Sequence, residues 1–393
     1  MRLPTILAVT VALALGAASC SSEAEEKRVT GVDELREALQ KAEPGSSVLL
    51  APGEYAGGLS LENLKGEEGR PIVIGAADPQ NPPRIVGGAQ AIHLSNVSYV
   101  ELRDLCVSGQ SGNGLNIDDG GSFDTPAHDI TLTRLTVTDI GPRGNRDGIK
   151  LSGVEDFVVR DCRIERWGDG GSGIDMVGCH GGLIKGCRFT AREGLGGSGV
   201  QAKGGSSRVT VRRCLFEHAG GRAVNIGGST GLQFFRPQGV GYEARDITVE
   251  GNVFVGSQAP FAFVGVDGAK VEYNTVYLPQ RWAMRILQET TEPGFVPCRD
   301  GVFRRNIVVF QSDKWSEGGV NIGPNTAPAS FVFEENLWYC GDRPDRSKPA
   351  LPTEEIDGLY GQDPLLADPP RGDFTLKEGS PAEGLGHTGL EEE

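Results

Sequence analysis

The chain has 393 residues, with 38 Lys and Arg against 53 Asp and Glu, which gives a formal net charge of -15. This acidic balance argues against a nucleic-acid partner, and it disfavours a polyanionic ligand unless local basic side chains or a bridging divalent cation attract one. The 58 Gly and the 7% aromatic content are typical of repeated backbone with tight turns rather than of one bulky globular core.

The first 19 residues are predicted to be an export signal. Arg2 precedes an apolar run that ends in small residues, and no second apolar stretch long enough to span a membrane follows. The tetrapeptide 17–20, Ala-Ala-Ser-Cys, resembles a bacterial lipobox, and the Ser21 that follows it resembles that of Gram-negative lipoproteins. The resemblance implies that Cys20 is the lipidated first residue of an outer-membrane protein. A cleaved signal ending near Ser19, with a periplasmic or secreted product, is the alternative.

A short amphipathic helix is expected after Thr30 and before the Pro-Gly pair at 44–45. Apolar residues recur in it at helical spacing, at Val32, Leu35, Ala38, Leu39 and Ala42. A strand over 47–50 follows it. This helix and the sequence PGSSVLLAPGEY behind it resemble the amino-terminal cap of pectate-lyase-like right-handed β-helices. Such a cap would cover the apolar end of the first coil.

One short unit recurs along the chain: a small residue, an apolar-polar-apolar triplet and, further on, a glycine-rich turn. Between successive copies lie two more short strands, so each repeat has the pattern of one coil of a β-solenoid. Irregular spacing places insertions in the turns at 227–244 and 288–300. The aligned triplets are 115–117, 149–151, 174–176, 200–202, 224–226, 261–263, 284–286 and 320–322.

A second marker runs in register with the first, at the bend after the second strand of each coil. Because equivalent positions of a parallel β-helix stack about 4.8 Å apart, this row should point inward, and its asparagines can bond the bends above and below. The row is Leu105, Leu135, Cys162, Cys187, Cys214, Asn252, Asn274, Asn306 and Asn336.

Two markers in register predict an all-β chain folded as a single right-handed parallel β-helix. We expect a three-sheet solenoid of roughly 9–11 coils with a short N-terminal capping helix. After the signal, residues 20–28 would be the lipidated Cys and a tether, and 29–60 the cap helix and first strand. Residues 61–386 would form the β-helix with a closing segment, and 387–393 a tail.

Seven Cys remain beside Cys20. Three of them fill the inward row, where free thiols are favoured, although neighbours at that spacing could form a disulfide. Cys179, His180 and Cys187 lack the spacing of a zinc site.

The middle residue of each triplet should face outward, because side chains alternate along a strand. A polar row of this kind suits an extended sugar chain, although any solvated sheet face would also be polar. A second outward row contains Asp118, Ser152, Val177 and Lys203. The first outward row is Asn116, Lys150, Asp175, Gln201, Asn225, Ala262, Arg285 and Asn321.

Lys203 is the candidate catalytic base. Arg222 precedes the next strand, and Arg281 and Arg285 lie further along the solenoid. A lysine among cations can give up its proton near the working pH, and an arginine beside it could neutralise a uronate carboxylate. The candidate catalytic residues are therefore Lys203, Arg222 and Arg285. The candidate substrate-binding residues are Asn116, Lys150, Asp175, Gln201, Asn225, Arg236, Arg281, Glu289 and Asn321.

The segment around Lys203 also resembles the catalytic coils of the chondroitinase B and alginate lyase family. Its strand ends in Lys, a small residue follows, and a strand, a bend, a strand and a Gly-x-x-x-Asn-x-Gly turn come next. The resemblance implies that Lys203 acts as base, with an Arg on the next coil. Here Asn225 occupies the position of that Arg, and Arg222 is three residues away. The family's calcium-binding acids are missing before Lys203.

Calcium is a candidate cofactor whose ligands the sequence does not assign. Asp118, Asp175 or Glu193 would have to hold it, and we expect no other metal site.

The favoured interpretation is a monomeric, exported lyase that cleaves an acidic, uronic-acid-containing polysaccharide by β-elimination. A non-catalytic cell-surface glycan-binding β-helix is the alternative from another class. A glycoside hydrolase or an epimerase on the same fold is a third, and it would need carboxyls such as Asp118, Asp147 and Asp175 to converge. The pairs Arg281-Trp282 and Phe234-Phe235, and Trp315, are candidate sugar-stacking platforms, with core filling or turn packing as the alternative for each.

Overall fold

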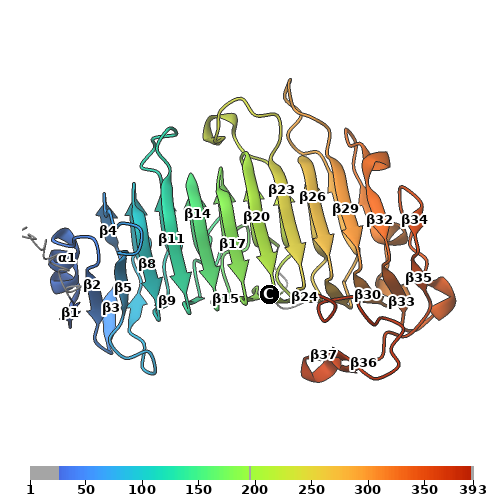
Figure 1. Cartoon of the computed structure of the whole chain (residues 1–393), viewed down its shortest axis with the longest axis horizontal. Coiled ribbons are helices and arrows are strands. Elements are labelled where there is room, and N and C mark those ends of the chain that lie inside the picture. The colour runs from blue at the N-terminus through green and yellow to red at the C-terminus, as the bar shows by residue number, and fades with distance from the viewer. Residues whose placement is uncertain (1–25, 194–195, 391–393) are drawn as a thin grey trace, which may run out of the picture.

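The computed structural model describes residues 26–193 and 196–390, which form a parallel β-helix with three long sheets (Figure 1). We call the ten-stranded sheet, which contains all eight predicted triplets, sheet I. The thirteen-stranded and twelve-stranded sheets are sheets II and III. All strand pairs in these three sheets are parallel, and each coil contributes one strand to each sheet through most of the solenoid. The predicted fold class is therefore confirmed.

The strands of sheet I are β4 (Leu59–Glu62), β7 (Ile92–Ser95), β10 (Leu115–Asp118), β13 (Ile149–Ser152), β16 (Ser172–Val177), β19 (Ser198–Lys203), β22 (Arg222–Gly227), β25 (Ala259–Val264), β28 (Met284–Leu287) and β31 (Val320–Ile322).

The strands of sheet II are β1 (Glu26–Val29), β2 (Ser47–Leu50), β5 (Ile72–Ala76), β8 (Ser98–Arg103), β11 (Ala127–Thr133), β14 (Val154–Arg160), β17 (His180–Lys185), β20 (Ser206–Arg212), β23 (Ala244–Glu250), β26 (Val266–Glu272), β29 (Arg299–Arg304), β32 (Val332–Glu334) and β34 (Glu355–Ile356).

The strands of sheet III are β3 (Glu54–Ala56), β6 (Arg84–Val86), β9 (Cys106–Ser108), β12 (Thr136–Thr138), β15 (Arg163–Glu165), β18 (Arg188–Thr190), β21 (Leu215–Glu217), β24 (Val253–Val255), β27 (Thr275–Tyr277), β30 (Ile307–Phe310), β33 (Leu337–Cys340) and β35 (Leu359–Tyr360).

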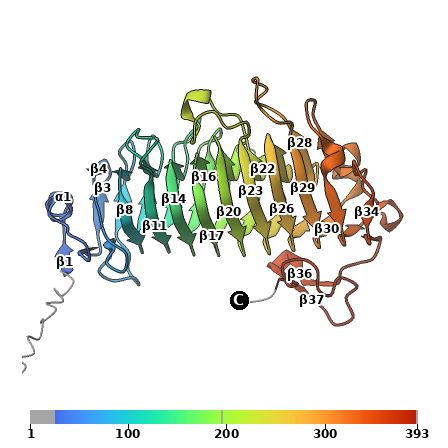
Figure 2. The same cartoon turned by 45° about the horizontal axis from the view of Figure 1, so that its top comes forward.

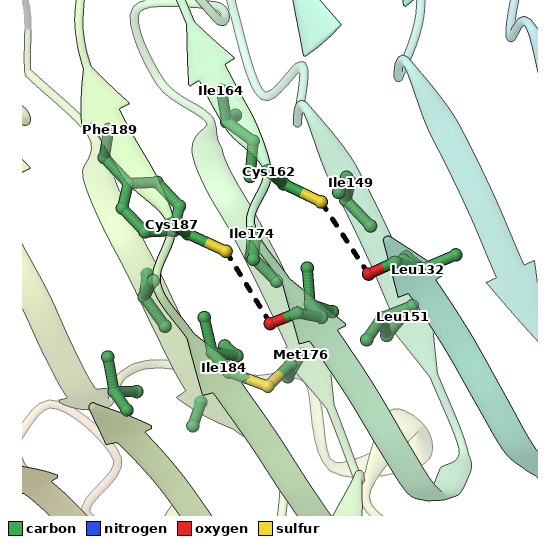
Figure 3. Close-up of a cluster of buried hydrophobic side chains, with 14 of the residues drawn as sticks. Leu132, Ile149, Leu151, Cys162, Ile164, Ile174, Met176, Ile184, Cys187 and Phe189 are labelled. Carbon is green, nitrogen blue, oxygen red and sulfur yellow. Dashed lines mark hydrogen bonds between the residues drawn. The ribbon is translucent and has the colours of Figure 1, made fainter. Parts of the chain in front are cut away.

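The inward row at the bends after sheet II is buried throughout. Its asparagines bond from coil to coil: Oδ1 of Asn274 accepts from the backbone N–H of Asn252 at 3.0 Å, and Nδ2 of Asn274 donates to the carbonyl of Val249 at 2.9 Å. Figure 3 shows Cys162 and Cys187 of the same row among interior apolar side chains. All seven cysteines of the described residues are free thiols. The row therefore needs no covalent link.

Helix α1 (Val32–Gln40) lies at the amino-terminal end of the solenoid and buries Leu35, Ala38 and Leu39. Strand β1 begins at Glu26 and pairs with β2, so residues 26–28 belong to sheet II although they were predicted as tether. The predicted signal and Cys20 lie outside the described residues. No helix of the described residues is long and apolar enough to cross a membrane.

The closing segment contains the hairpin of β36 (Leu366–Asp368) and β37 (Asp373–Leu376), which folds back beneath sheet III (Figure 2). Leu366 and Phe374 pack against Ile307 and Leu337 on the outside of that sheet. The backbone N–H of His387 donates to Oγ1 of Thr275 at 3.1 Å. The solenoid contact thus continues past residue 386, where the predicted tail begins.

Candidate functional site

A groove of about 580 Å³ lies on the outer face of sheet I. It extends from β7 to β19, four strand spacings or about 19 Å along the solenoid axis. One wall is the turn after β10, and the other is the insertion between β22 and β23, residues 228–243, which projects from the solenoid in Figure 1. Its lining includes Ser95, Asp118, Asp119, Asn145, Lys150, Ser152, Lys203, Thr230, Phe234 and Arg236.

Two lysines of the groove share one buried carboxylate. Strand register places Lys150 beside Asp175, and Lys203 extends from the neighbouring strand. Nζ of Lys203 lies 3.2 Å from Oδ1 of Asp175, and Nζ of Lys150 donates a hydrogen bond to Oδ2. Asp175 is 0% exposed and does not line the groove. The groove is therefore lined by both lysine side chains, while the carboxylate that pairs with them lies beneath.

A second buried carboxylate extends this network. Oδ2 of Asp147 lies 3.9 Å from Nζ of Lys150, and its Oδ1 accepts the backbone N–H of Ser172 at 2.8 Å. Burial, reinforced by the charge of Asp175, raises the pKa of Asp147 to about 7, although Lys150 opposes the shift. Burial lowers the pKa of Lys150, but Asp175 and Asp147 raise it by more, so the net direction is upward. Lys150 is thus held as an ammonium, and Asp147 titrates near neutral pH.

Asp118 is an ionised acceptor at the amino-terminal end of the groove. Nε2 of His93 lies 2.6 Å from its Oδ2, and Oγ of Ser95 donates to its Oδ1 at 2.8 Å. Nδ2 of Asn116 donates to Oδ2 at 2.9 Å. Burial raises the pKa of Asp118, but the hydrogen bonds from His93 and Ser95 lower it by more. Asp118 is therefore a carboxylate at neutral pH.

The insertion wall is fixed to the solenoid at several points. Arg236 makes a bidentate ion pair with Asp119, which follows β10, four strands away from the start of the insertion at β22. Its guanidinium lies 4.2 Å from the centre of the Phe123 ring. Glu243, which is fully buried, accepts hydrogen bonds from the backbone N–H of Gly204 and of Thr230. These contacts hold the wall against the groove.

Phe234 is the exposed aromatic side chain of the groove, with 53% of its surface accessible. It belongs to the short helical turn Leu232–Phe234 of the insertion wall. An exposed ring beside polar groups is the usual platform for a sugar face. Its neighbour Phe235 is buried and packs edge-on against Phe295 of the next insertion. Of the two adjacent rings, only Phe234 therefore lines the groove.

An arginine cluster lies on the same face of sheet I, outside the groove. We define it as Arg222, Arg281, Trp282, Arg285 and Glu289. Nη2 of Arg222 lies 2.7 Å from Oε1 of Glu289. The guanidiniums of Arg281 and Arg285 lie 4.1 and 4.8 Å from the centre of the Trp282 ring. Burial and the charge of Arg222 lower the pKa of Arg285. Three guanidiniums therefore crowd one region of the sheet.

The structure brings only part of the predicted site together. Lys203 lies with Lys150, Asp175 and Gln201, whose Oε1 accepts from Nζ of Lys203 at 3.4 Å. The groove lining also contains Arg236, and Asn116 bonds to its Asp118. A separate group contains Arg222, Asn225, Arg281, Arg285, Glu289 and Asn321.

Of the cations expected near Lys203, Arg222 does not lie beside it on the neighbouring strand. Arg222 pairs in register with Ser198, five residues before Lys203, so the two backbones lie about 17 Å apart along the strand direction. The nearest charge to Lys203 is Asp175 instead. Asp175 and Asn225 are also not solvent-facing rungs, because both are buried under longer side chains.

Sequence reasoning missed His93, Ser95 and Thr230. For the first two a signal was present, since Ile92-His93-Leu94 is one more apolar-polar-apolar triplet and β7 pairs in register with β10. Thr230 lies in an insertion without a repeat pattern, and nothing in the sequence placed it at the groove.

Two of the acids considered for calcium, Asp118 and Asp175, do not fit a cation. Oδ2 of Asp175 accepts from Nζ of Lys150, and Oδ1 faces the ammonium-bearing side chain of Lys203 as an ion pair with no hydrogen bond from the described residues. Asp118 accepts from three side chains. Within the described residues no group of three or more His, Cys, Asp or Glu could hold a metal ion. We therefore assign calcium no ligands and no step.

The fold and the groove define a right-handed parallel β-helix with a polar groove on its first sheet. Residues 90–277, which contain the groove's lysines, match the family described as the right handed beta helix region. The predicted parallel β-helix fold is confirmed, and the family match covers this part of the chain. A search of curated proteins finds no match.

Several solved structures are similar to this chain. An alginate lyase from Paenibacillus sp. str. FPU-7 is 18% identical over 76% of this chain and 99% of its own, with a TM-score of 0.56. Pectate lyase Pel9A is 13% identical over 87% and 86% of the two chains, with a TM-score of 0.48. A GH136 lacto-N-biosidase from Eubacterium ramulus is 15% identical over 84% and 64%, with a TM-score of 0.49. Similarity at these identities concerns the fold.

Proposed function

We propose that this protein is an exported, polysaccharide-active lyase that cleaves an acidic, uronic-acid-containing chain by β-elimination in the groove, with Lys203 as the base. The observation that carries this assignment is that Lys203 and Lys150 enter one groove and are held from beneath by the two oxygens of Asp175. β-Elimination needs a cation at the uronate carboxylate and a base at C5, and the two lysines supply one group for each task.

The two lysines have different roles in this reaction. The ammonium of Lys150 binds the uronate carboxylate and so makes the C5 proton more acidic. Lys203, after releasing its own proton to solvent, takes the C5 proton. The electron pair of the C–H bond forms the C4–C5 double bond, and the C4–O bond breaks. The leaving oxygen takes the proton back from Lys203, which ends the cycle neutral. Asp175 is a positioning residue, since it fixes both Nζ atoms.

We assign the carboxylate-facing role to Lys150 rather than to Arg222 or Arg285. Those arginines were the sequence-based candidates, but they lie outside the groove that contains Lys203. Asp118, a half-buried carboxylate of the groove, accepts hydrogen bonds from the protein and binds sugar hydroxyls through its remaining surface. Asp147 and Asp175 are buried, and Asp175 is paired with both lysines, which argues against the free converging carboxyls that a hydrolase would need.

We also propose that the protein acts outside the cell as a monomer, tethered through a lipid on Cys20. The support is the lipobox-like sequence at 17–20. Cys20→Ala should move the protein from the membrane fraction to the soluble fraction of cells that express the full chain. A protein that stays with the membrane after this substitution would contradict the anchor.

A glycan-binding protein without catalysis is the second candidate. Lys203 is engaged in an ion pair with Asp175, and an ammonium cannot accept a proton until it has lost one. Such a protein would retain the polysaccharide on the same groove without producing new chain ends.

The test is incubation with a panel of acidic polymers, beginning with alginate and pectate because lyases of those names share the fold. Wild type, Lys203→Ala and the control Lys185→Ala, an exposed lysine of sheet II, are compared. Unsaturated products seen by ultraviolet absorbance, lost only in Lys203→Ala, are expected. New reducing ends without unsaturation would indicate a hydrolase, C5 inversion an epimerase, and retention alone a binding protein. Each of these outcomes would overturn the lyase.

A further inference from the structure

The arginine cluster lies in line with the groove on the outer face of sheet I. Arg285 occupies the same outward row as Gln201, with Asn225 and Ala262 between them. The strands that carry Lys203 and Arg285 are three spacings apart, about 14 Å along the axis. A ligand chain that continues past Lys203 parallel to the axis would therefore reach the cluster.

The cluster has more positive than negative charge. Of its arginines, Arg222 is paired with Glu289. Arg281 and Arg285 have no ion pair to any carboxylate of residues 26–193 and 196–390, and the nearby Glu317 accepts from Nδ2 of Asn321 instead. Two guanidiniums thus lack an acidic partner in a chain whose formal net charge is -15.

The arrangement is held by packing rather than by ion pairs. The Trp282 ring, which is 5% exposed, contacts both unpaired guanidiniums, and Nε of Arg285 donates to Oδ1 of Asn321 at 2.9 Å. Nε1 of Trp282 is buried and has no acceptor in the described part of the chain. Burial and the charge of Arg222 lower the pKa of Arg285, and a bound anion would favour its charged form. A planar fork of donors fixed on an indole is well suited to a carboxylate or sulfate group.

We propose that the arginine cluster is a second binding site, which takes an anionic sugar unit of the same polysaccharide chain that occupies the groove. This inference rests on the proposed function, and it adds that the protein engages its substrate at two anionic units about 14 Å apart. Short oligosaccharides fill the groove alone, whereas longer ones gain the arginine contacts. The protein therefore binds internal stretches of polymer in preference to isolated chain ends.

The test measures affinity against oligosaccharide length. Alginate oligosaccharides supply carboxylates alone, and chondroitin sulfate oligosaccharides supply sulfate esters too. Dissociation constants for a disaccharide and an octasaccharide of each are determined by calorimetry in the Lys203→Ala background, so that the probe is not degraded. The variants are Arg281→Ala, at an exposed side chain, and Arg281→Ala with Arg285→Gln. The control is Arg188→Ala, an exposed arginine of sheet III.

We expect the octasaccharide to bind about tenfold or more tightly than the disaccharide, and this gain to be reduced by Arg281→Ala and lost in the double variant. Arg188→Ala should keep the gain. The inference is overturned if no probe binds, if length brings no gain, or if the gain survives in the double variant. Failure of the proposed lyase activity can be distinguished from failure of this inference. In that case the protein with Lys203 intact forms no unsaturated product, but the gain in affinity with length is still lost in the arginine variants.

Discussion

Nζ of Lys203 lies 3.2 Å from Oδ1 of Asp175, and the other oxygen of the same carboxylate accepts a hydrogen bond from Nζ of Lys150. Asp175 has no exposed surface, whereas both lysines reach the groove. One buried carboxylate thus sets the position of two cations on neighbouring coils. The stability of the coils and the geometry of the proposed reaction depend on the same residue.

Asp175→Asn should therefore destabilise the protein as well as inactivate it. Removing one partner of a buried ion pair leaves charge without compensation, which costs about 3 kcal/mol. Asp33→Asn is the matched control, because the Asp33 side chain is 93% exposed and its pair with Arg36 should contribute less than about 0.5 kcal/mol. Denaturant unfolding measures both variants. Equal, small losses would show that Asp175 does not hold the lysines.

Asp147 should make the stability fall as pH rises. Its pKa is raised to about 7 in the folded protein, above the value near 4 of an unfolded chain, so between these values the folded state holds a proton that the unfolded state has released. The free energy of unfolding then decreases with pH over that window, by at most about 1.4 kcal/mol per pH unit, and is level for this group above it.

Asp147→Asn removes this titration and keeps an acceptor for the N–H of Ser172. Unfolding curves of wild type and variant at pH 5 and pH 8 are compared. The free energy of unfolding of the variant, relative to that of wild type, should be greater at pH 8 than at pH 5. A difference that is the same at both pH values would contradict the raised pKa.

The asparagines of the inward row should contribute more than the thiols. Asn274 is fully buried, and Asn274→Ala leaves the N–H of Asn252 and the carbonyl of Val249 without their partner, at a cost of about 3 kcal/mol. Cys187→Ala removes a small buried group at an equivalent place and should cost about 1 kcal/mol. Chemical denaturation tests the order. Equal costs would mean that the amide bonds add nothing beyond packing.

Arg236→Ala should loosen the wall of the groove. It removes the ion pair with the buried Asp119, so the insertion 228–243 should open more often and be cut about tenfold faster by a protease. Arg236→Lys keeps the charge without the bidentate contact and should be intermediate. Arg371→Ala, at a side chain 86% exposed, serves as control. Unaltered cleavage in Arg236→Ala would show that the wall is held by its other contacts.

The sequence predicted the solenoid because its two markers obey rules that act on every coil. Side chains alternate along a strand, so the triplets with Lys150, Asp175 and Gln201 at their centres fall in register on one sheet. The same register places Asp175 one strand from Lys203. The core of the candidate site could therefore be found without the structure.

The rest of the site depends on features that do not repeat. Residues 228–243 cross four coils to bring Arg236 to Asp119, and no periodic pattern encodes that path. Arg222 was predicted to lie near Lys203 because their strands are neighbours along the solenoid axis. Arg222 begins its strand, however, and Lys203 ends the neighbouring one, so the two residues are separated along the strand direction. Asp175 was predicted to face solvent, but the longer side chains of Lys150 and Lys203 cover it.

The most direct test of the central claim is the rate of unsaturated product formation by Lys203→Ala, with Lys185→Ala as the matched surface lysine. A general base contributes about 10²- to 10⁴-fold, so the first variant should lose activity by a factor of at least about 10² while it remains folded, and the second should keep its activity. Undiminished product formation by a folded Lys203→Ala protein would contradict the assignment of Lys203 as the base.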